Sequence, residues 1–183
     1  MISALDRSRL PCDLDARLAE AWRVLETVLD PEVPVLSVVD LGIVRDVRGD
    51  DGEGLVVAVT PTYSGCPAVE AIEADIVSAL ARAGLGPVRV EIRRSPAWTT
   101  DWMGDAAKEK LRAYGIAPPG AATPGEATIR LVPRAARVAT APLACPRCES
   151  RDTERISPFG ATACKALWRC RACREPFEHM KAI

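Results

Sequence analysis

The sequence predicts an α+β protein in which a small α-β-β-α-β domain, with helices packed on one face of a short mixed sheet, precedes a compact cysteine-rich ribbon. Three observations lead to this prediction. Apolar residues recur with helical spacing in two segments, and short β-branched runs lie between and after them. Four of the seven cysteines form two C-x-x-C pairs near the end of the 183 residues. The chain is therefore expected to fold as one larger and one smaller unit.

The first predicted element is an amphipathic helix that begins after Asp13, a candidate N-cap, and is stopped by Pro31. Its apolar stripe consists of Leu14, Leu18, Ala21, Trp22, Leu25, Val28 and Leu29. Strand character follows in the second half of VLSVVDLGIVRDV (35–47), then a turn cluster at 49–54 and the run LVVAVT at 55–60. The two runs predict a β-hairpin.

A second amphipathic helix is predicted from Pro67 to about Gly84, because proline suits a first helical turn, where its missing N–H costs nothing. Its apolar side consists of Val69, Ile72, Ile76, Ala79, Leu80 and Ala83. Apolar and charged residues then alternate in VRVEIRR (88–94), which is typical of a strand with one face in water.

A linker is predicted at 115–127, because GIAPPGAATPG is too rich in proline and glycine for regular structure. Before it, a short helix at about 102–114, with Asp101 near its cap, closes a first domain placed at 13–114. After it, the cysteine-rich domain occupies 128–183 and opens on an extended segment, TIRLVPRAARV.

Composition favours a cytoplasmic protein. No apolar run approaches the roughly 18 residues of a membrane-spanning helix, and the first fifteen residues lack the apolar stretch of a secretion signal. Residues 1–127 carry 13 basic and 20 acidic side chains, whereas 128–183 carry 11 and 5. The basic end is weak evidence for nucleic acid, because four thiolates on a divalent ion would lower its net charge from +6 to about +4.

The two C-x-x-C pairs predict a structural zinc site. Each pair presents two sulfurs to one ion, and the residues between the pairs are enough for a hairpin that brings them together: Cys145, Cys148, Cys170 and Cys173. Rubredoxin-like iron would use the same ligands, and two separate redox motifs are a more distant alternative. With so few apolar residues, this zinc ribbon needs its metal in order to fold. Of the other candidates nearby, Cys164 is expected to be a small residue in the ribbon's second strand and His179 a solvated residue.

The first domain contains a second candidate site in TPTYSGCPAVE (60–70). Cys66 lies where a strand passes into a helix, so its thiol faces free N–H groups and the positive end of the helix dipole, which favours the thiolate. With no histidine before His179, a Cys-His catalytic pair within this domain is excluded. A metal-handling thiol, a persulfide-handling thiol and a buried structural thiol remain open.

An acidic loop in the first domain supplies further candidates. The segment DPEVP offers Asp30 and Glu32 between two prolines, and Asp40 opens DLG before a strand. The alternative is ordinary capping and turn chemistry, in which such aspartates bond to nearby backbone N–H groups.

These motifs resemble a known family. DPEVPVLSVVDLGIV, TPTYSGCPAVEAIEADI and the cysteine-rich end are similar to the PaaD family of accessory subunits, which belongs to the bacterial phenylacetyl-CoA 1,2-epoxidase system of aerobic phenylacetate degradation. The first domain alone is similar to the wider family of SufT-type iron-sulfur assembly factors. The resemblance covers the chain from about Leu14. It implies that Asp30, Glu32 and Asp40 belong to an acidic loop, Thr60 and Cys66 to a thiol loop, and the four paired cysteines to a zinc ribbon.

The resemblance also implies a function. In such systems one subunit holds a di-iron centre and a reductase carries flavin and an iron-sulfur cluster. A PaaD-type chain is expected to be an accessory factor, not itself catalytic, that helps to mature one of these centres. Its expected cofactors are structural zinc and a transient iron ion or iron-sulfur cluster held by Cys66 with Asp30 or Glu32. Its expected partners are the oxygenase or the reductase, with a homodimer as a way to share the site.

Two other functions stay open at this point. A pure docking module would need the ribbon but not Cys66. A nucleic-acid-binding ribbon would lose affinity steeply with salt, but its few aromatic residues, chiefly Phe159, Trp168 and Phe177, make base stacking an unconvincing interpretation.

Overall fold

The computed structural model describes residues 10–50, 54–63, 65–120 and 143–183, with side chains from residue 14 onward. The chain divides into two compact units between Trp98 and Thr99. Within the described residues, none of the helices combines the length and the apolar character needed to span a lipid bilayer.

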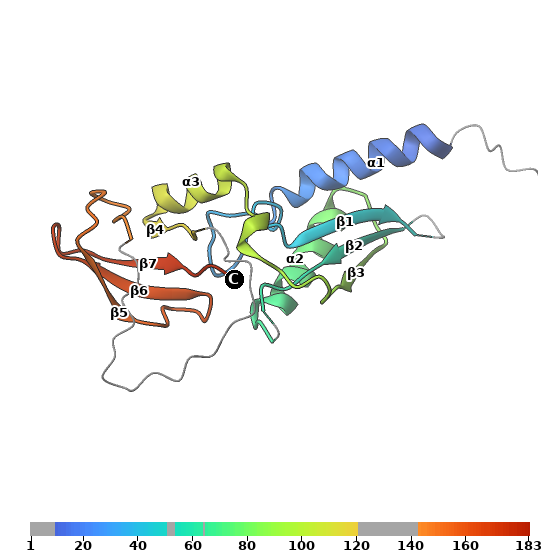
Figure 1. The fold of residues 1–183 in the computed structure, drawn as a ribbon. Helices are drawn as coiled ribbons and strands as arrows, with labels where there is room; N and C mark the ends of the chain where they lie inside the picture. Colours follow the sequence, from blue (N-terminus) through green and yellow to red (C-terminus); the bar gives the residue numbers. More distant parts are fainter. Residues whose placement is uncertain (1–9, 51–53, 64, 121–142) are drawn as a thin grey trace, which may run out of the picture. The chain divides into compact units, whose positions relative to one another are not determined.

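The first unit has the predicted order α-β-β-α-β, which confirms the expected fold class (Figure 1). Its elements are α1 (Leu10–Leu25), β1 (Val44–Gly49), β2 (Leu55–Val59), α2 (Ala68–Arg82) and β3 (Val88–Ile92). The sheet order is β1-β2-β3, with β1 and β2 antiparallel and β2 and β3 parallel. Helices α1 and α2 contact each other as well as β1 and β3 respectively, so both helices lie on one face of this mixed sheet.

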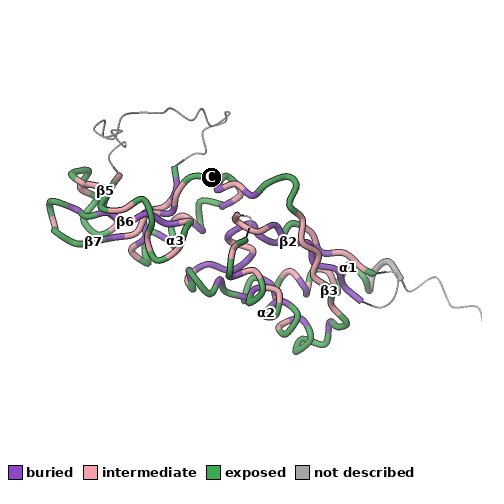
Figure 2. Tube along the Cα trace, turned by 90° about the horizontal axis from the view of Figure 1, so that it is seen from below, coloured by how far each residue is buried: buried purple, intermediate pink, exposed green. Residues whose placement is uncertain are grey.

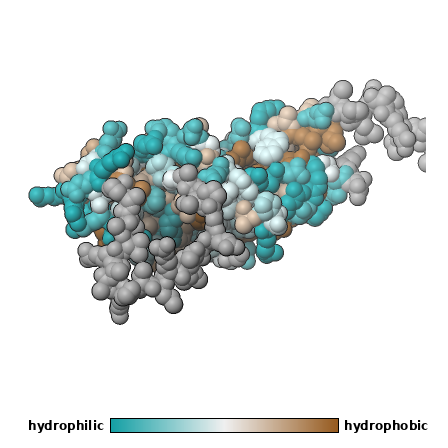
Figure 3. All heavy atoms as spheres, viewed as in Figure 1, coloured by the Kyte–Doolittle hydropathy of each residue, from teal (hydrophilic) through white to brown (hydrophobic). Residues whose placement is uncertain are grey.

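The core of the first unit lies between the helices and the central strand. All five residues of β2 are buried, and buried positions recur along one side of α2 (Figure 2). On α2 these are Ala68, Ile72, Ile76 and Leu80. This spacing is the helical period that the sequence predicts. By contrast, Leu14 of α1 is 38% exposed, and Figure 3 shows an apolar area over this helix.

The other face of the sheet is covered by a closed ring of ion pairs. Asp46 and Arg48 of β1 meet Glu91 of β3 and the adjacent Arg93: Arg48 bonds to Asp46 at 3.3 Å and to Glu91, and Arg93 bonds to Glu91 at 3.0 Å and to Asp46 at 3.4 Å. By register, Ala58 of β2 lies between Asp46 and Glu91, and it is fully buried. The ring explains how a strand between two charged neighbours can be buried on both faces.

Two boundaries of α1 differ from the prediction. The helix begins at Leu10 rather than after Asp13, so Asp13 lies within the helix and is not its N-cap. Proline at position 11 fits this earlier start, because the first helical turn needs no N–H there. The helix ends at Leu25, and the chain then turns back through an isolated bridge between Leu29 and Ser37.

The second unit contains η1 (Thr100–Trp102), α3 (Asp105–Tyr114), β4 (Ile116–Ala117), β5 (Thr153–Ser157), β6 (Lys165–Cys170) and β7 (Pro176–Met180). Its sheet order is β4-β7-β6-β5, in which β4 pairs with β7 in parallel and the other pairs are antiparallel. The expected extended segment at 128–138 and most of the expected linker lie outside the described residues.

Helix α3 and strand β4 belong to this second unit, whereas the sequence assigned them to the first domain and the linker. Two sets of hydrogen bonds explain the difference. Strand β4 adds to the ribbon sheet beside β7. The Thr100 N–H donates to the Ile183 carbonyl oxygen at 3.1 Å, and the Thr99 hydroxyl donates to it at 2.7 Å. The bonds to Ile183 join residues more than eighty positions apart, and sequence periodicity does not report contacts between such distant segments.

Candidate metal centre and thiol pocket

The four paired cysteines converge in the second unit. Their sulfurs all lie within 4.8 Å of one another, with Cys145 and Cys173 at 3.8 Å and Cys148 and Cys170 at 3.6 Å. A tetrahedral zinc ion with Zn–S bonds of about 2.3 Å requires sulfurs about 3.8 Å apart. The donor set and its spacing therefore fit one tetrahedral metal ion.

Both cysteine pairs lie in the same type of turn. The Cys145 N–H donates to the Ser150 carbonyl at 2.9 Å, and the Cys170 N–H donates to the Glu175 carbonyl at 3.0 Å. The residue after each pair, Glu149 or Arg174, has a left-handed backbone with φ of 61° or 66°. These two residues were not predicted from sequence, although their shared position directly after each C-x-x-C pair was a usable signal.

The thiols cannot ionise together without a cation. The backbone N–H of Cys173 lowers the pKa of Cys170 to about 7. The backbone N–H of Ser150 acts to lower the pKa of Cys148, but burial and the other three cysteines raise it to about 12. Four thiolates in one place therefore need a bound ion, which would release their protons on binding.

Two residues near this centre were interpreted from sequence and lie apart from it. His179 was expected to be solvated, and this prediction is wrong. The residue lies on β7 with its ring edge-on to that of Trp168, and the two ring centroids are 6.1 Å apart. Burial lowers the pKa of His179 to about 4. Cys164 directly precedes β6, and its sulfur lies 3.0 Å from the Thr162 hydroxyl. Neither belongs to the group of four cysteines that could hold a metal.

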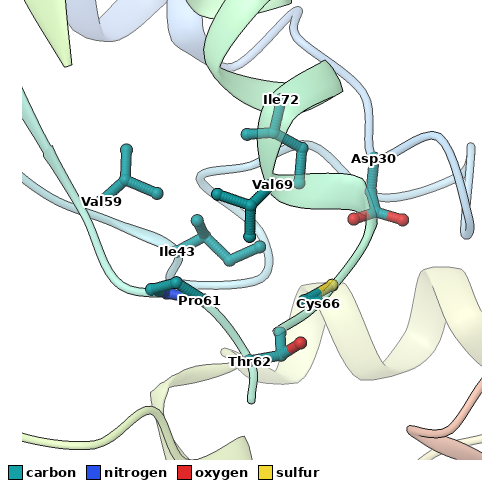
Figure 4. Close-up of a pocket in the computed structure, with 8 residues that line it drawn as sticks. All are labelled: Asp30, Ile43, Val59, Pro61, Thr62, Cys66, Val69 and Ile72. Atoms are coloured by element: carbon teal, nitrogen blue, oxygen red, sulfur yellow. The ribbon is translucent and has the colours of Figure 1, made fainter. Parts of the chain in front are cut away.

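Cys66 lies in a separate pocket of the first unit (Figure 4). The pocket is lined by Asp30, Ile43, Val59, Pro61, Thr62, Cys66, Val69 and Ile72. Its volume is about 20 Å³, enough for about one water-sized group. Cys66 is partly exposed and directly precedes Pro67, the N-cap of α2. The backbone of Gly65 is left-handed at φ 82°, so glycine is favoured at the turn that presents the thiol.

Asp30 is the acidic-loop residue that shares this pocket with Cys66. It is 7% exposed, and its Oδ1 atom accepts hydrogen bonds from the backbone N–H groups of Glu32 at 2.8 Å and Val33 at 2.7 Å. These bonds hold the carboxylate in place at the loop. In the described part of the chain, its second oxygen, Oδ2, has no hydrogen-bond partner.

The other three predicted residues do not line the pocket. Glu32 is exposed. The carboxylate of Asp40 accepts the Ser37 N–H at 2.9 Å, and the Ser37 hydroxyl accepts the Asp40 N–H at 3.0 Å, which is turn chemistry. Thr60 is buried, and its hydroxyl has no partner among the residues that the structure describes. The structure thus brings together only two of the five candidates, Asp30 and Cys66.

The fold and the two sites together define a two-part class of protein, an iron-sulfur assembly-type domain joined to a zinc ribbon. Residues 18–93 match the family model of an iron-sulfur cluster assembly protein, and residues 132–181 match that of the PaaD zinc beta ribbon domain. An Escherichia coli (strain K12) protein provisionally named as the D component of 1,2-phenylacetyl-CoA epoxidase is 47% identical over 96% of this chain and 99% of its own length. The chain belongs to this PaaD family.

Two further relatives match the first part of the chain. An Fe-S protein maturation auxiliary factor of Porphyromonas gingivalis (strain ATCC BAA-308 / W83) is 36% identical over 49% of this chain and 85% of its own length. The crystal structure of a domain of unknown function, DUF59, from Bacillus anthracis aligns with a TM-score of 0.51 at 29% identity, over 55% of this chain and 95% of that one. The likeness to assembly proteins is thus found in the domain that contains Cys66.

Proposed function

We propose that the chain is an accessory factor of the phenylacetyl-CoA 1,2-epoxidase system and assists the assembly of an iron-sulfur or di-iron centre in the oxygenase or the reductase. Support comes from its full-length similarity to an epoxidase component and from the assembly-type domain. The observation that carries the proposal is the pocket shared by Cys66 and Asp30 within that domain. It pairs a partly exposed thiol with a buried carboxylate, and both groups bind metal ions.

The ribbon has a different role in this proposal. Zinc held by Cys145, Cys148, Cys170 and Cys173 would be permanent, because four thiolates complete its coordination and leave no open position for chemistry. The ribbon then serves as a rigid surface for contact with an epoxidase subunit. A homodimer is one way to supply more ligands to the Cys66 pocket.

The test is to co-express the epoxidase subunits with the wild-type chain or with Cys66→Ser, and to measure the iron content and activity of the purified epoxidase. We expect Cys66→Ser to lower both at least several-fold. The matched control is Cys164→Ser, which removes a partly exposed thiol outside both sites and should leave both values unchanged. Wild-type iron and activity with Cys66→Ser would contradict the proposal and favour a docking module.

A further inference from the structure

We infer that Ile156 and Phe159, at the hairpin that joins β5 to β6 (Figure 1), are the anchor by which the ribbon contacts an epoxidase subunit. The surface that fits this anchor is an apolar pocket of the partner protein, rimmed by carboxylates. The inference deepens the proposed function and rests on it for the partner, because that proposal gives the ribbon a docking role without locating the contact. Three features of the hairpin carry it: exposure, rigidity and charge.

Phe159 is exposed, although its side chain is one that proteins normally bury. At 61% it is the most exposed large apolar side chain in the described part of the chain, and Ile156 is 52% exposed. The chain's other phenylalanine, Phe177, is 4% exposed and belongs to the core of the ribbon. Isolated exposed apolar residues are ordinary, but an aromatic residue held rigidly at the surface is typical of a protein interface.

The hairpin loop, residues 158–164, is held in one shape by β6 and β7. Glu178 of β7 uses both carboxylate oxygens for this: Oε1 accepts the Ala161 N–H at 2.8 Å, and Oε2 pairs with the buried Lys165 ammonium at 2.8 Å. The Gly160 N–H donates to the Lys165 carbonyl oxygen at 2.8 Å, and a Cβ at Gly160 would lie 2.5 Å from Glu178 Oε1. A loop fixed in this way loses little conformational entropy when a partner binds.

Lys181 holds the Phe159 ring itself. The Lys181 N–H donates to the Cys164 carbonyl oxygen at 2.9 Å, and its ammonium donates to the Pro158 carbonyl oxygen at 3.3 Å. The same ammonium lies 4.7 Å from the centroid of the Phe159 ring, which attracts it as a cation–π pair. An aromatic ring held in a fixed orientation suits a pocket of defined shape, whereas insertion into lipid requires no fixed orientation.

The charges beside the anchor select the partner. Arg155 and Lys181 form no ion pair with a carboxylate among the residues that the structure describes. The acidic residues of β5 and β7 are already engaged, Glu154 with two arginines and Glu178 with the buried lysine. Two apolar side chains next to two uncompensated cations complement an apolar pocket with carboxylates at its rim. Nucleic acid is less suited, because its binding draws on many phosphate contacts.

The second unit also offers matched controls. Tyr114 of α3 is 56% exposed and lies outside the hairpin, so Tyr114→Ala is the control for Phe159→Ala. Arg151 is exposed and precedes the other end of β5, so Arg151→Glu is the control for Arg155→Glu. Phe159→Leu keeps an apolar side chain at the anchor. Zinc content and thermal unfolding of each variant establish that the ribbon is intact before binding is measured.

The experiment is isothermal titration calorimetry of the full zinc-loaded chain with the oxygenase and with the reductase, each purified separately in metal-free form. We expect one of them to bind. Phe159→Ala should weaken this affinity at least tenfold, Phe159→Leu should weaken it less, and Arg155→Glu should weaken it several-fold and reduce its dependence on salt. Both controls should match wild type. A photoreactive phenylalanine analogue at position 159 should crosslink to a partner segment that combines apolar and acidic residues.

Several results would overturn the inference: no binding of either protein to the wild-type chain, unchanged affinity in Phe159→Ala, or equal weakening by Tyr114→Ala. Self-association of the chain, or attachment to phosphatidylglycerol vesicles, that needs Phe159 in place of epoxidase binding would also overturn it.

The maturation test separates this inference from the proposed function. Loss of epoxidase iron with Cys66→Ser but unchanged affinity in Phe159→Ala would contradict the anchor alone. Binding that depends on Phe159, together with a fully matured epoxidase in the Cys66→Ser background, would contradict the proposed function alone.

Discussion

At the scale of single residues, the two cysteine turns contain backbone strain. Glu149 and Arg174 are exposed and left-handed, a conformation that costs an L-residue about 1–2 kcal/mol. We expect Glu149→Gly and Arg174→Gly each to stabilise the zinc-loaded chain by about 0.5–1 kcal/mol, since glycine removes the strain but adds unfolded-state entropy. Urea unfolding of the second unit measures the change. The control is Arg151, which is exposed but does not have a positive φ, so Arg151→Gly should destabilise the chain. Equal destabilisation by all three substitutions would contradict the presence of strain at Glu149 and Arg174.

His179 gives the ribbon a dependence on pH. Burial, with a smaller effect of Lys181, lowers its pKa from 6.5 to about 4. In the unfolded chain His179 binds a proton as the pH falls below 6.5, whereas in the folded chain it does so only at about pH 4. The free energy of unfolding therefore decreases as the pH falls through this range. Between pH 6.5 and 5 the loss should be about 1 kcal/mol, after allowance for solvent screening.

The check is the difference between wild type and His179→Gln in urea unfolding at pH 6.5 and pH 5, both loaded with zinc. Thiol protonation affects both chains alike, so the variant should lose about 1 kcal/mol less stability than wild type. Identical pH dependence would mean that the imidazole does not titrate between these limits.

At the scale of elements, the helices and the hairpin were predictable from sequence because their signals are local. The apolar positions of α2 repeat at helical spacing, and the alternation in β3 marks a strand with one polar face. Strand β4 has no such signal. It contains two residues, Ile116 and Ala117, in a stretch rich in proline and glycine, and it is a strand only because β7 pairs with it.

This pairing predicts how the second unit can be isolated. A fragment of residues 99–183 retains α3, β4 and the bonds from Thr99 and Thr100 to Ile183. A fragment of residues 128–183, the domain boundary expected from sequence, loses all of them. We expect both to bind zinc through the cysteines, but the longer fragment to melt at a temperature at least several degrees higher. Equal melting temperatures of the zinc-loaded fragments would show that β4 contributes nothing to the fold.

At the scale of the whole molecule, the two units have separate sources of stability. The first has a broad aliphatic core between its sheet and helices. The core cluster of the second consists of Ala117, Cys145, Ala166, Trp168, Cys170 and Phe177, of which two are cysteines of the metal centre. A small domain of this kind depends on its metal for folding.

Metal removal should therefore affect the two units differently. With a strong chelator, amide hydrogens of β6 and β7 should lose protection from exchange, while those of β2 keep it. Hydrogen exchange read by mass spectrometry resolves these strands, and Cys148→Ser should reproduce the effect without chelator. Persistent protection of β6 after complete metal removal would contradict a metal-dependent fold.

The sequence by itself determined the fold class, the order of the main elements and the four cysteines of the ribbon. Each depends on spacing along the chain, which helical period, strand alternation and ligand geometry convert directly into structure. Only the tertiary structure decided that α3 and β4 belong with the ribbon, and that Asp30 shares a pocket with Cys66 while Glu32, Asp40 and Thr60 do not line it. Those outcomes depend on which side chains meet after distant segments pack, and no local pattern encodes that choice.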